Sequence, residues 1–382
     1  MHIKYYIDKV ENRIVFCPDN EGLNIVKKNI SSMVLAGDLS RLYPNQKILL
    51  IIDKKINKRI TKYLIHELKI SNPKMAIMMV SGNKNNKNMK LLFKIIDNLF
   101  NKKFTKKSVI ISCGGGVIGD VGALASSLYL RGLIHFHIPT TMTAIIDSCI
   151  GGKTGINYKG IINSLGTYYH SKRVYISKNI INLLPKREFL AGIPEIIKCG
   201  LIHKKSILTK LNNKNKILKR DFPYIAKIIK STLMTKIEFF KNDISEENER
   251  LRLNFGHTFA HAIEMALQFE KGNEIRHGEA VGIGLLCEIY YAFGKNKDFL
   301  LTKKLLEKYK LPTNLRNFIK KGKFKKIESK IYQNIFLDKK RINTFPRYIK
   351  LFKIGNSNIS EMRDFDRIKD TIKKIILSNE KY

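Results

Sequence analysis

The stretch SVIISCGGGVIGD, residues 108–120, decides the fold. Its first five residues are mostly apolar and β-branched, which is typical of a buried strand. Three glycines, Gly114, Gly115 and Gly116, follow, and residues 121–130 have a helical pattern. A strand that enters a helix through a glycine turn is the repeating unit of a parallel sheet. Because glycines leave the backbone N–H groups accessible at the helix N-terminus, a phosphate group can bind there.

Further strand patterns surround this unit. They cover Lys47–Asp53, Met75–Val80 and Ile134–Ile138, and amphipathic helical patterns separate most of them. The alternation predicts an α/β fold, with a parallel sheet and helices on both faces.

The carboxyl ends of parallel strands form one edge of the sheet, where ligands bind in such folds. Gly119 and Asp120 complete the glycine turn at this edge, and Thr140 and Thr141 follow the next strand. The turn departs from the GxGxxG pattern of dinucleotide-binding folds, so a tight strand-to-helix turn is the alternative interpretation. The segment 147–155 places Asp147 and Lys153 around a glycine pair but lacks the spacing of a Walker loop.

Helical patterns dominate after about Pro185. They cover Arg187–Gly200, Ser206–Phe240, Arg250–Phe269 and Glu279–Phe293, whereas the Lys-rich chain from about residue 303 is weakly patterned. We therefore predict two domains, an α/β domain at residues 1–183 and a mostly helical domain at residues 184–382.

The composition excludes several classes of protein. A hydrophobic content of 44% excludes a largely disordered chain, and the five cysteines include no CxxC pair, so neither a disulfide framework nor a Cys-rich zinc site is indicated. No apolar stretch reaches the ~20 residues of a membrane span, and Asp8 and Glu11 argue against a secretory signal. We expect a soluble, cytoplasmic protein without a membrane partner.

The net charge is +39, from 71 Lys+Arg and 32 Asp+Glu. Lysine is spread over the whole chain rather than clustered, which favours a solvated surface over a specific nucleic-acid site. The charge would still attract anionic small molecules.

The helical half contains a candidate metal site. His257 and His261 are four residues apart and share one helix face. Any two of His257, His261 and His277, together with Glu195, would give two histidines and one carboxylate, the ligand set of catalytic zinc. The spacing leaves open which histidines bind, and packed or surface histidines are the alternative. We interpret His135 and His137, on a strand, as structural.

Taken in order, six segments resemble the 3-dehydroquinate synthases, a family of sugar-phosphate cyclases. They are GGGVIGD at 114–120, PTT at 139–141, DSCIGGKTGIN at 147–157, AGIPEIIKCGLI at 191–202, LNFGHTFAHAIE at 253–264 and HGEAVGIG at 277–284. The resemblance implies a Rossmann-like NAD+-binding domain followed by a helical domain that binds metal and substrate. It also implies conversion of 3-deoxy-arabino-heptulosonate 7-phosphate to 3-dehydroquinate and phosphate, a lyase reaction of the shikimate pathway.

The resemblance also implies roles for individual residues. By this resemblance, Glu195, His257 and His277 bind the metal, Zn²⁺ or Co²⁺. The residues that bind NAD+ are Asp53, Gly114, Gly115, Gly116, Gly119, Asp120, Thr140, Thr141, Asp147 and Lys153. Catalytic roles fall to His261, Lys153, Lys198 and Arg250. The sugar phosphate falls to Arg131, Lys153, Asn163, Lys198, Lys236, Arg250, Asn254, His261 and Lys340, with Lys339 as the alternative to Lys340. Arg131 matches an arginine that crosses a dimer interface, so a homodimer is implied.

The chain departs from the family pattern at several positions. Ile162 stands where the family has a lysine, and Asn83 replaces an acidic residue near the nucleotide. Pro194 precedes Glu195, and Ala260 stands where glycine is common. None of these changes removes a predicted metal ligand.

Three alternatives remain open. The chain is compatible with a cyclase for another sugar phosphate and with a metal-dependent glycerol or alcohol dehydrogenase of the same fold. The non-enzymatic alternative is a decayed, basic, RNA-binding relative, although no RNA-recognition motif is visible.

Overall fold

A computed structural model describes residues 6–10, 13–17, 39, 43–268, 274–320, 322–337 and 345–378. The chain folds as two compact units, Met1–Pro185 and Lys186–Tyr382. The division lies two residues beyond the predicted boundary at 183.

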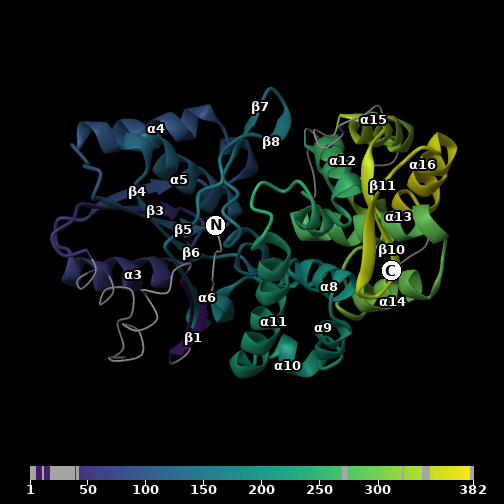
Figure 1. The fold of residues 1–382 in the computed structure, drawn as a ribbon, viewed down its shortest axis with the longest axis horizontal. Helices are drawn as coiled ribbons and strands as arrows, with labels where there is room; N and C mark the ends of the chain where they lie inside the picture. The colour runs from purple at the N-terminus through teal and green to yellow at the C-terminus, as the bar shows by residue number, and fades with distance from the viewer. Residues whose placement is uncertain are drawn as a thin grey trace. The chain divides into compact units, whose positions relative to one another are not determined.

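The first unit is built on a seven-stranded sheet with the order β1-β2-β9-β6-β5-β3-β4 (Figure 1). Strands β3, β4, β5, β6 and β9 are parallel, as predicted, whereas β1 pairs antiparallel with β2 and β2 with β9. The strands are β1 Tyr6–Val10, β2 Arg13–Cys17, β3 Ile48–Asp53, β4 Ala76–Val80, β5 Val109–Gly114, β6 Ile134–Pro139 and β9 Arg173–Ser177.

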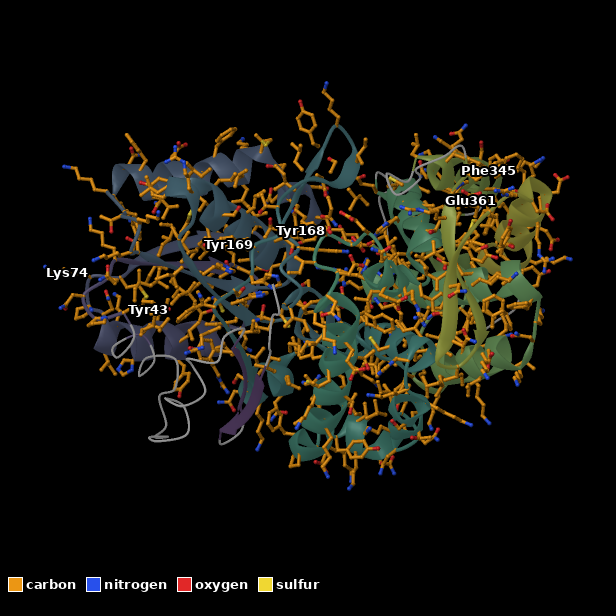
Figure 2. The ribbon with its side chains drawn as sticks, viewed as in Figure 1. Tyr43, Lys74, Tyr168, Tyr169, Phe345 and Glu361 are labelled. Carbon is orange, nitrogen blue, oxygen red and sulfur yellow. The ribbon has the colours of Figure 1, made fainter. Side chains whose placement is uncertain are left out.

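Helices cover both faces of this sheet (Figure 1). Alternate residues of β3 and β5 point to opposite faces, which produces two apolar layers. One layer packs against α4 (Met89–Asn101) and α5 (Gly116–Leu128), and the other against α3 (Lys58–Ser71) and α6 (Lys178–Leu183). Tyr43, labelled in Figure 2, closes the second layer with its ring 5.6 Å from that of Phe136.

Short elements connect the strands. They are the 3₁₀ turns η1 (Lys84–Asn86) and η2 (Tyr129–Arg131), the π-helical turn η3 (Ala144–Ser148) and the antiparallel hairpin β7–β8 (Ile156–Tyr158 and Ile161–Leu165). The segment that carries Asp147 and Lys153 thus runs from η3 into this hairpin.

The second unit is mostly helical. Its helices are α7 Lys186–Leu190, α8 Ile193–Ile202, α9 Lys205–Lys210, α10 Lys214–Leu218, α11 Phe222–Phe240, α12 His257–Leu267, α13 His277–Phe293, α14 Lys297–Lys308, α15 Phe324–Phe336 and α16 Phe365–Thr371. The turns η4 (Glu249–Asn254), η5 (Arg316–Phe318) and η6 (Ile372–Ile376) join them, and β10 (Arg347–Lys353) pairs antiparallel with β11 (Asn356–Glu361).

Three predicted helical stretches are interrupted. The first, Arg187–Gly200, is divided between α7 and α8 at residues 191–192. The pattern over Ser206–Phe240 forms three helices because Asn213 and Asp221 cap new N-termini with their side chains, and Pro223 lies in the first turn of α11. The pattern that begins at Arg250 breaks at Gly256, whose φ of 80° lies in the left-handed region. Apolar periodicity continues across these breaks, which is why it failed to reveal them. Among the described residues, no helix is both long enough and apolar enough to cross a bilayer.

Glycines allow close packing around the start of α12. A Cβ atom on Gly284 of α13 would lie 1.9 Å from the carbonyl oxygen of Gly256, and one on Gly278 would lie 1.6 Å from that of Ala191. Because both obstacles are backbone atoms, no side-chain rotation relieves them.

We predict that Gly284→Ala destabilises the protein by about 3 kcal/mol, because α12 and α13 must separate. Gly282→Ala on the same helix is the matched control, since its Cβ would meet side-chain atoms only, the tip of Leu306 at 3.0 Å and the ring of Pro194 at 3.3 Å. Urea unfolding of both variants measures the difference. Equal stabilities would show that the backbone contact at Gly284 is unimportant.

Candidate active site

The glycine turn lies at the carboxyl edge of the sheet, as predicted. Gly114 ends β5 opposite Pro139 of β6, and its carbonyl accepts a hydrogen bond from Thr140 N at 2.9 Å. A Cβ atom on Gly115 would lie 3.0 Å from Thr141 Cγ2. The glycines and the two threonines therefore lie together at the carboxyl ends of β5 and β6. The N-terminus of α5, at Gly116, lies at the same place.

Asp53 ends the neighbouring strand β3 at the same edge. Its Oδ1 accepts hydrogen bonds from Lys55 N at 3.0 Å and from Gly82 N at 3.1 Å. A Cβ atom on Gly82 would lie 2.3 Å from Asp53 Oδ2, so the carboxylate is held closely against the turn after β4.

A polar cluster forms between α5 and the β7–β8 hairpin. Lys87 Nζ lies 2.5 Å from Asp120 Oδ2 and also donates to the side chain of Asn163. Burial raises the pKa of Asp120, whereas Lys87 and Lys153 act in the opposite direction. A small cavity beside this cluster is lined by Asp120 and Lys153, among others. Asp120, Lys153 and Asn163, three predicted site residues, therefore lie in one region of the first unit.

Lys87 was missed by the sequence analysis. It lies after β4, at the same sheet edge as the other residues, but in a Lys- and Asn-rich segment where no single lysine stands out. The signal available was its place in the loop that follows β4, directly after η1.

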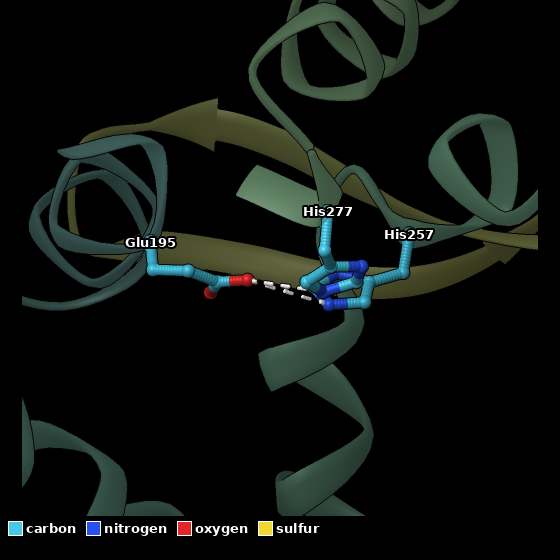
Figure 3. Close-up of side chains that lie close together, drawn as sticks. All are labelled: Glu195, His257 and His277. Atoms are coloured by element: carbon cyan, nitrogen blue, oxygen red, sulfur yellow. Dashed lines mark ion pairs between the residues drawn. The ribbon is translucent and has the colours of Figure 1, made fainter. Parts of the chain in front are cut away.

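The predicted metal ligands converge in the second unit (Figure 3). Glu195 is the third residue of α8, and His257 and His277 are the first residues of α12 and α13. Glu195 Oε1 lies 3.7 Å from His257 Nε2 and 3.5 Å from His277 Nε2. One ligand atom from each residue lies within 4.8 Å of the others, a spacing that one ion can bridge.

The other ring nitrogens orient the imidazoles. His257 Nδ1 lies 3.1 Å from the carbonyl oxygen of Phe255, and His277 Nδ1 lies 3.0 Å from Glu264 Oε2. These acceptors hold the proton on Nδ1 and leave Nε2 as the ligand atom, an arrangement common at protein metal sites. Burial lowers the pKa of His277, but Glu264 and Glu195 outweigh it and raise that pKa to about 10. The two carboxylates thus favour a positive charge at His277.

Glu195 is buried, with 1% of its side chain exposed. Lys198 Nζ forms an ion pair with its Oε2 at 2.5 Å. Neither carboxylate oxygen accepts a hydrogen bond of normal geometry from the described residues. A buried carboxylate oxygen that faces two imidazole nitrogens fits a divalent metal, with room for a further ligand.

His261 lies beside this group without belonging to it. Its ring centroid lies 5.4 Å from that of His257 and 6.2 Å from that of His277. The structure thus groups His257 and His277, but not His261, with Glu195. The spacing of the histidines in the sequence had left this choice open.

Three of the six predicted substrate-binding residues of the second unit are buried cations. Lys198, Lys236 and Arg250 are 1%, 6% and 2% exposed, which is unusual for such side chains. Arg250 and Asn254 both lie on η4, directly before the metal-bearing helix α12.

Two predicted residues are not placed with these groups. Lys340, like Lys339, lies outside the described residues. Arg131 is exposed at the amino end of β6, the opposite end of that strand from Thr140, and its φ of 62° follows one of 49° at Leu130.

Comparisons with known proteins identify the family. The model of the 3-dehydroquinate synthase N-terminal domain matches residues 77–191, and that of the C-terminal domain matches residues 192–341. The chain belongs to the 3-dehydroquinate synthase family. It is 32% identical to the 3-dehydroquinate synthase of Prochlorococcus marinus (strain MIT 9312), over 91% of this chain and 92% of the relative. It is 34% identical to that of Helicobacter pylori (strain G27), over 86% and 92%.

Solved structures share the fold. The 2-epi-5-epi-valiolone synthase ValA of Streptomyces hygroscopicus, solved with NAD+ and Zn²⁺, has a TM-score of 0.77 at 22% identity, over 86% of this chain and 90% of that one. A probable glycerol dehydrogenase from Sinorhizobium meliloti has a TM-score of 0.62 at 14% identity, over 88% and 92%. These likenesses confirm the predicted fold class, an α/β domain followed by a helical domain.

The ligand assignment makes a direct prediction. His257→Ala should abolish stoichiometric zinc binding, whereas the matched control His261→Ala, one helical turn away, should retain it. Elemental analysis of the purified variants after dialysis against zinc measures the difference. Retention of one zinc by His257→Ala would refute its role as a ligand.

Glu264→Gln should weaken zinc binding by about 10- to 100-fold, since an amide orients and polarises His277 less than a carboxylate does. Competition with a chromophoric chelator measures the affinity. If zinc binds as tightly as in the unchanged protein, the contact between Glu264 and His277 has no influence on the metal.

Proposed function

We propose that this protein is a 3-dehydroquinate synthase, a lyase that converts 3-deoxy-arabino-heptulosonate 7-phosphate to 3-dehydroquinate and phosphate in aromatic amino acid biosynthesis. The convergence of Glu195, His257 and His277 among buried cations carries the proposal. The cofactors are NAD+ and one divalent metal, Zn²⁺ in the first place and Co²⁺ as an alternative. We also propose a cytoplasmic homodimer in which Arg131 of one subunit reaches the site of the other.

The metal residues fit an open catalytic site. Two imidazoles and one carboxylate leave a net positive charge on a bound divalent ion, which can polarise a substrate hydroxyl and favour its ionised form. The ligands come from the first turns of three helices, so they are held by the backbone and need little rearrangement.

The buried cations bind the anionic groups of the substrate. A substrate with a phosphate dianion and a carboxylate needs several positive groups, and Lys198, Lys236 and Arg250 supply them in the second unit. Arg250 can bind two oxygens in a forked geometry, whereas the lysines act as point charges. Asn254 adds a neutral amide on the same turn as Arg250.

His261 suits proton transfer. It is partly buried one helical turn after His257, and an imidazole exchanges protons near neutral pH. We assign it to moving a proton to or from the substrate oxygen at the metal.

The nucleotide binds at the carboxyl edge of the sheet in the first unit. The turn at Gly114–Gly116 and the N-terminus of α5 suit the pyrophosphate, and Asp53 suits a ribose hydroxyl. An apolar groove with a volume of about 400 Å³ is lined by Ile60, Tyr63, Leu64, Ile138, Ile180 and Leu183, among others. Its size and apolar lining suit the adenine ring. Bound NAD+ supplies transient oxidation of one substrate hydroxyl and is regenerated.

A metal-dependent glycerol or alcohol dehydrogenase is the second candidate, because such enzymes share the fold. A small uncharged polyol has no use for three buried cations in the unit that holds the metal residues. The cations therefore favour a phosphorylated, carboxylated substrate.

The decisive test is turnover by the purified protein with the heptulosonate phosphate, NAD+ and zinc. We expect one phosphate released per substrate consumed, with no net gain in NADH absorbance, because the cofactor is regenerated. Net NADH formation from glycerol or a simple alcohol, without phosphate release from the sugar phosphate, would instead identify a dehydrogenase. Phosphate release from a sugar phosphate that lacks the carboxylate, but not from the heptulosonate phosphate, would identify a cyclase for another substrate.

A further inference from the structure

The loop between α11 and η4 folds around one carboxylate. Asp243 Oδ1 accepts a hydrogen bond from Glu247 N, and Asp243 Oδ2 accepts two more, from Asn248 N and Arg250 N, each at 2.9 Å. The side chain is 9% exposed. One carboxylate thus satisfies three backbone donors over the seven residues that separate Asp243 from Arg250.

The same loop holds the side chain of Arg250. Arg250 Nη1 donates to the carbonyl oxygen of Ile244 at 2.7 Å, and its guanidinium lies 5.2 Å from the ring centroid of Phe240. The loop carbonyl and the aromatic ring therefore fix the guanidinium from two sides. The direction of Arg250 depends on how residues 243–250 are folded.

The loop also contacts Asn254. Glu246 Oε1 accepts a hydrogen bond from Asn254 Nδ2 at 2.6 Å, and Glu246 has a left-handed φ of 63°. A non-glycine residue in this conformation needs support from its surroundings, which the Asp243 hydrogen bonds supply. Both polar side chains of η4 that we assign to the substrate are thus held by this loop.

Three backbone N–H groups that point at one side chain require a side chain that only accepts hydrogen bonds. A carboxylate meets that requirement, whereas an asparagine amide presents an N–H₂ to at least one donor. Burial raises the pKa of Asp243, but the hydrogen bonds from Glu247, Arg250 and Asn248 outweigh it and lower that pKa below its usual value. The group is therefore ionised under all physiological conditions.

We propose that Asp243 is a positioning residue that presents Arg250, and through Glu246 also Asn254, to an anionic oxygen group of the substrate. Asp243 acts by folding the loop and does not touch the substrate. The proposal rests on the proposed function in one respect only. The proposed function identifies the anion as the phosphate or the carboxylate of the sugar-acid substrate.

The test compares Asp243→Asn with Asp364→Asn. Asp364 caps α16 through one backbone hydrogen bond, from Arg367 N at 2.9 Å, so it is a matched carboxylate-to-amide control. For Asp243→Asn we expect KM for the heptulosonate phosphate to rise at least about tenfold, the effect of losing one hydrogen bond to a charged group. Zinc content and NAD+ affinity should be unchanged in both variants, and KM should be unchanged in Asp364→Asn.

A double-mutant cycle tests whether Asp243 acts through Arg250. If it does, adding Asp243→Asn to Arg250→Ala should raise KM little further, because the guanidinium is already absent. Fully additive effects, or an unchanged KM in Asp243→Asn, would overturn the proposal. Loss of zinc and NAD+ binding together with substrate binding would also overturn it, since Asp243 would then support the whole unit.

Calorimetry with inorganic phosphate separates this proposal from the proposed function. The unchanged protein should bind phosphate more tightly than Asp243→Asn does, whether or not the sugar phosphate is turned over. If the unchanged protein shows no turnover but this difference persists, the proposed function fails and the role of Asp243 stands. If turnover occurs but both proteins bind phosphate and substrate equally, the role of Asp243 fails alone.

Discussion

The helical unit depends on a carboxylate that is sealed from water beside two imidazoles and an ammonium group. Burying an ionised carboxylate costs several kcal/mol unless opposite charge compensates it. Lys198 compensates one oxygen of Glu195, and the second oxygen faces the nitrogens of His257 and His277. All three acid and imidazole groups come from the first turns of helices, so three helix N-termini converge on this point. Their partial positive charges stabilise the carboxylate and equally favour an anionic ligand at the metal.

A single glycine links metal binding to anion binding. Gly256, with its left-handed φ, lies between η4 and α12 as the N-cap of α12, so Arg250 and Asn254 lie on one side of it and His257 and His261 on the other. The close approach of Gly284 to the Gly256 carbonyl oxygen fixes this junction against α13, which carries His277. The backbone itself therefore sets the spacing between Arg250 and Asn254, which we propose bind the substrate, and His257, which we propose binds the metal. Long, flexible side chains have little freedom left to change it.

Much of this arrangement could be predicted from the sequence because its signals are local. The glycine turn follows a β-branched strand directly, and the metal ligands are of residue types that are scarce in this chain. The contacts of Lys87, Glu264 and Asp243 could not be predicted in the same way. Lys87 is one of 71 basic residues, and its partner Asp120 is 33 residues away. Glu264 meets His277 only because α12 and α13 pack together, and Asp243 acts on backbone groups, which carry no sequence signature. The helix breaks at Asn213 and Asp221 did have capping signals, but continuous apolar periodicity concealed them.

The fold alone does not distinguish a cyclase from a dehydrogenase, since solved structures of both kinds resemble this chain. The charged groups of the helical unit favour a cyclase. A buried lysine or arginine is stable only when anionic or polar groups surround it, and the unit that holds the metal residues buries three such cations, of which Lys198 pairs with Glu195. A ligand with a phosphate and a carboxylate provides that compensation, and each hydrogen bond to a charged group contributes about 1.5–3 kcal/mol, at least a tenfold gain in affinity. An uncharged polyol offers these cations no negative charge. Selection between the two substrate classes thus follows from charge, with the common fold serving only to bring the cations and the metal ligands into one unit.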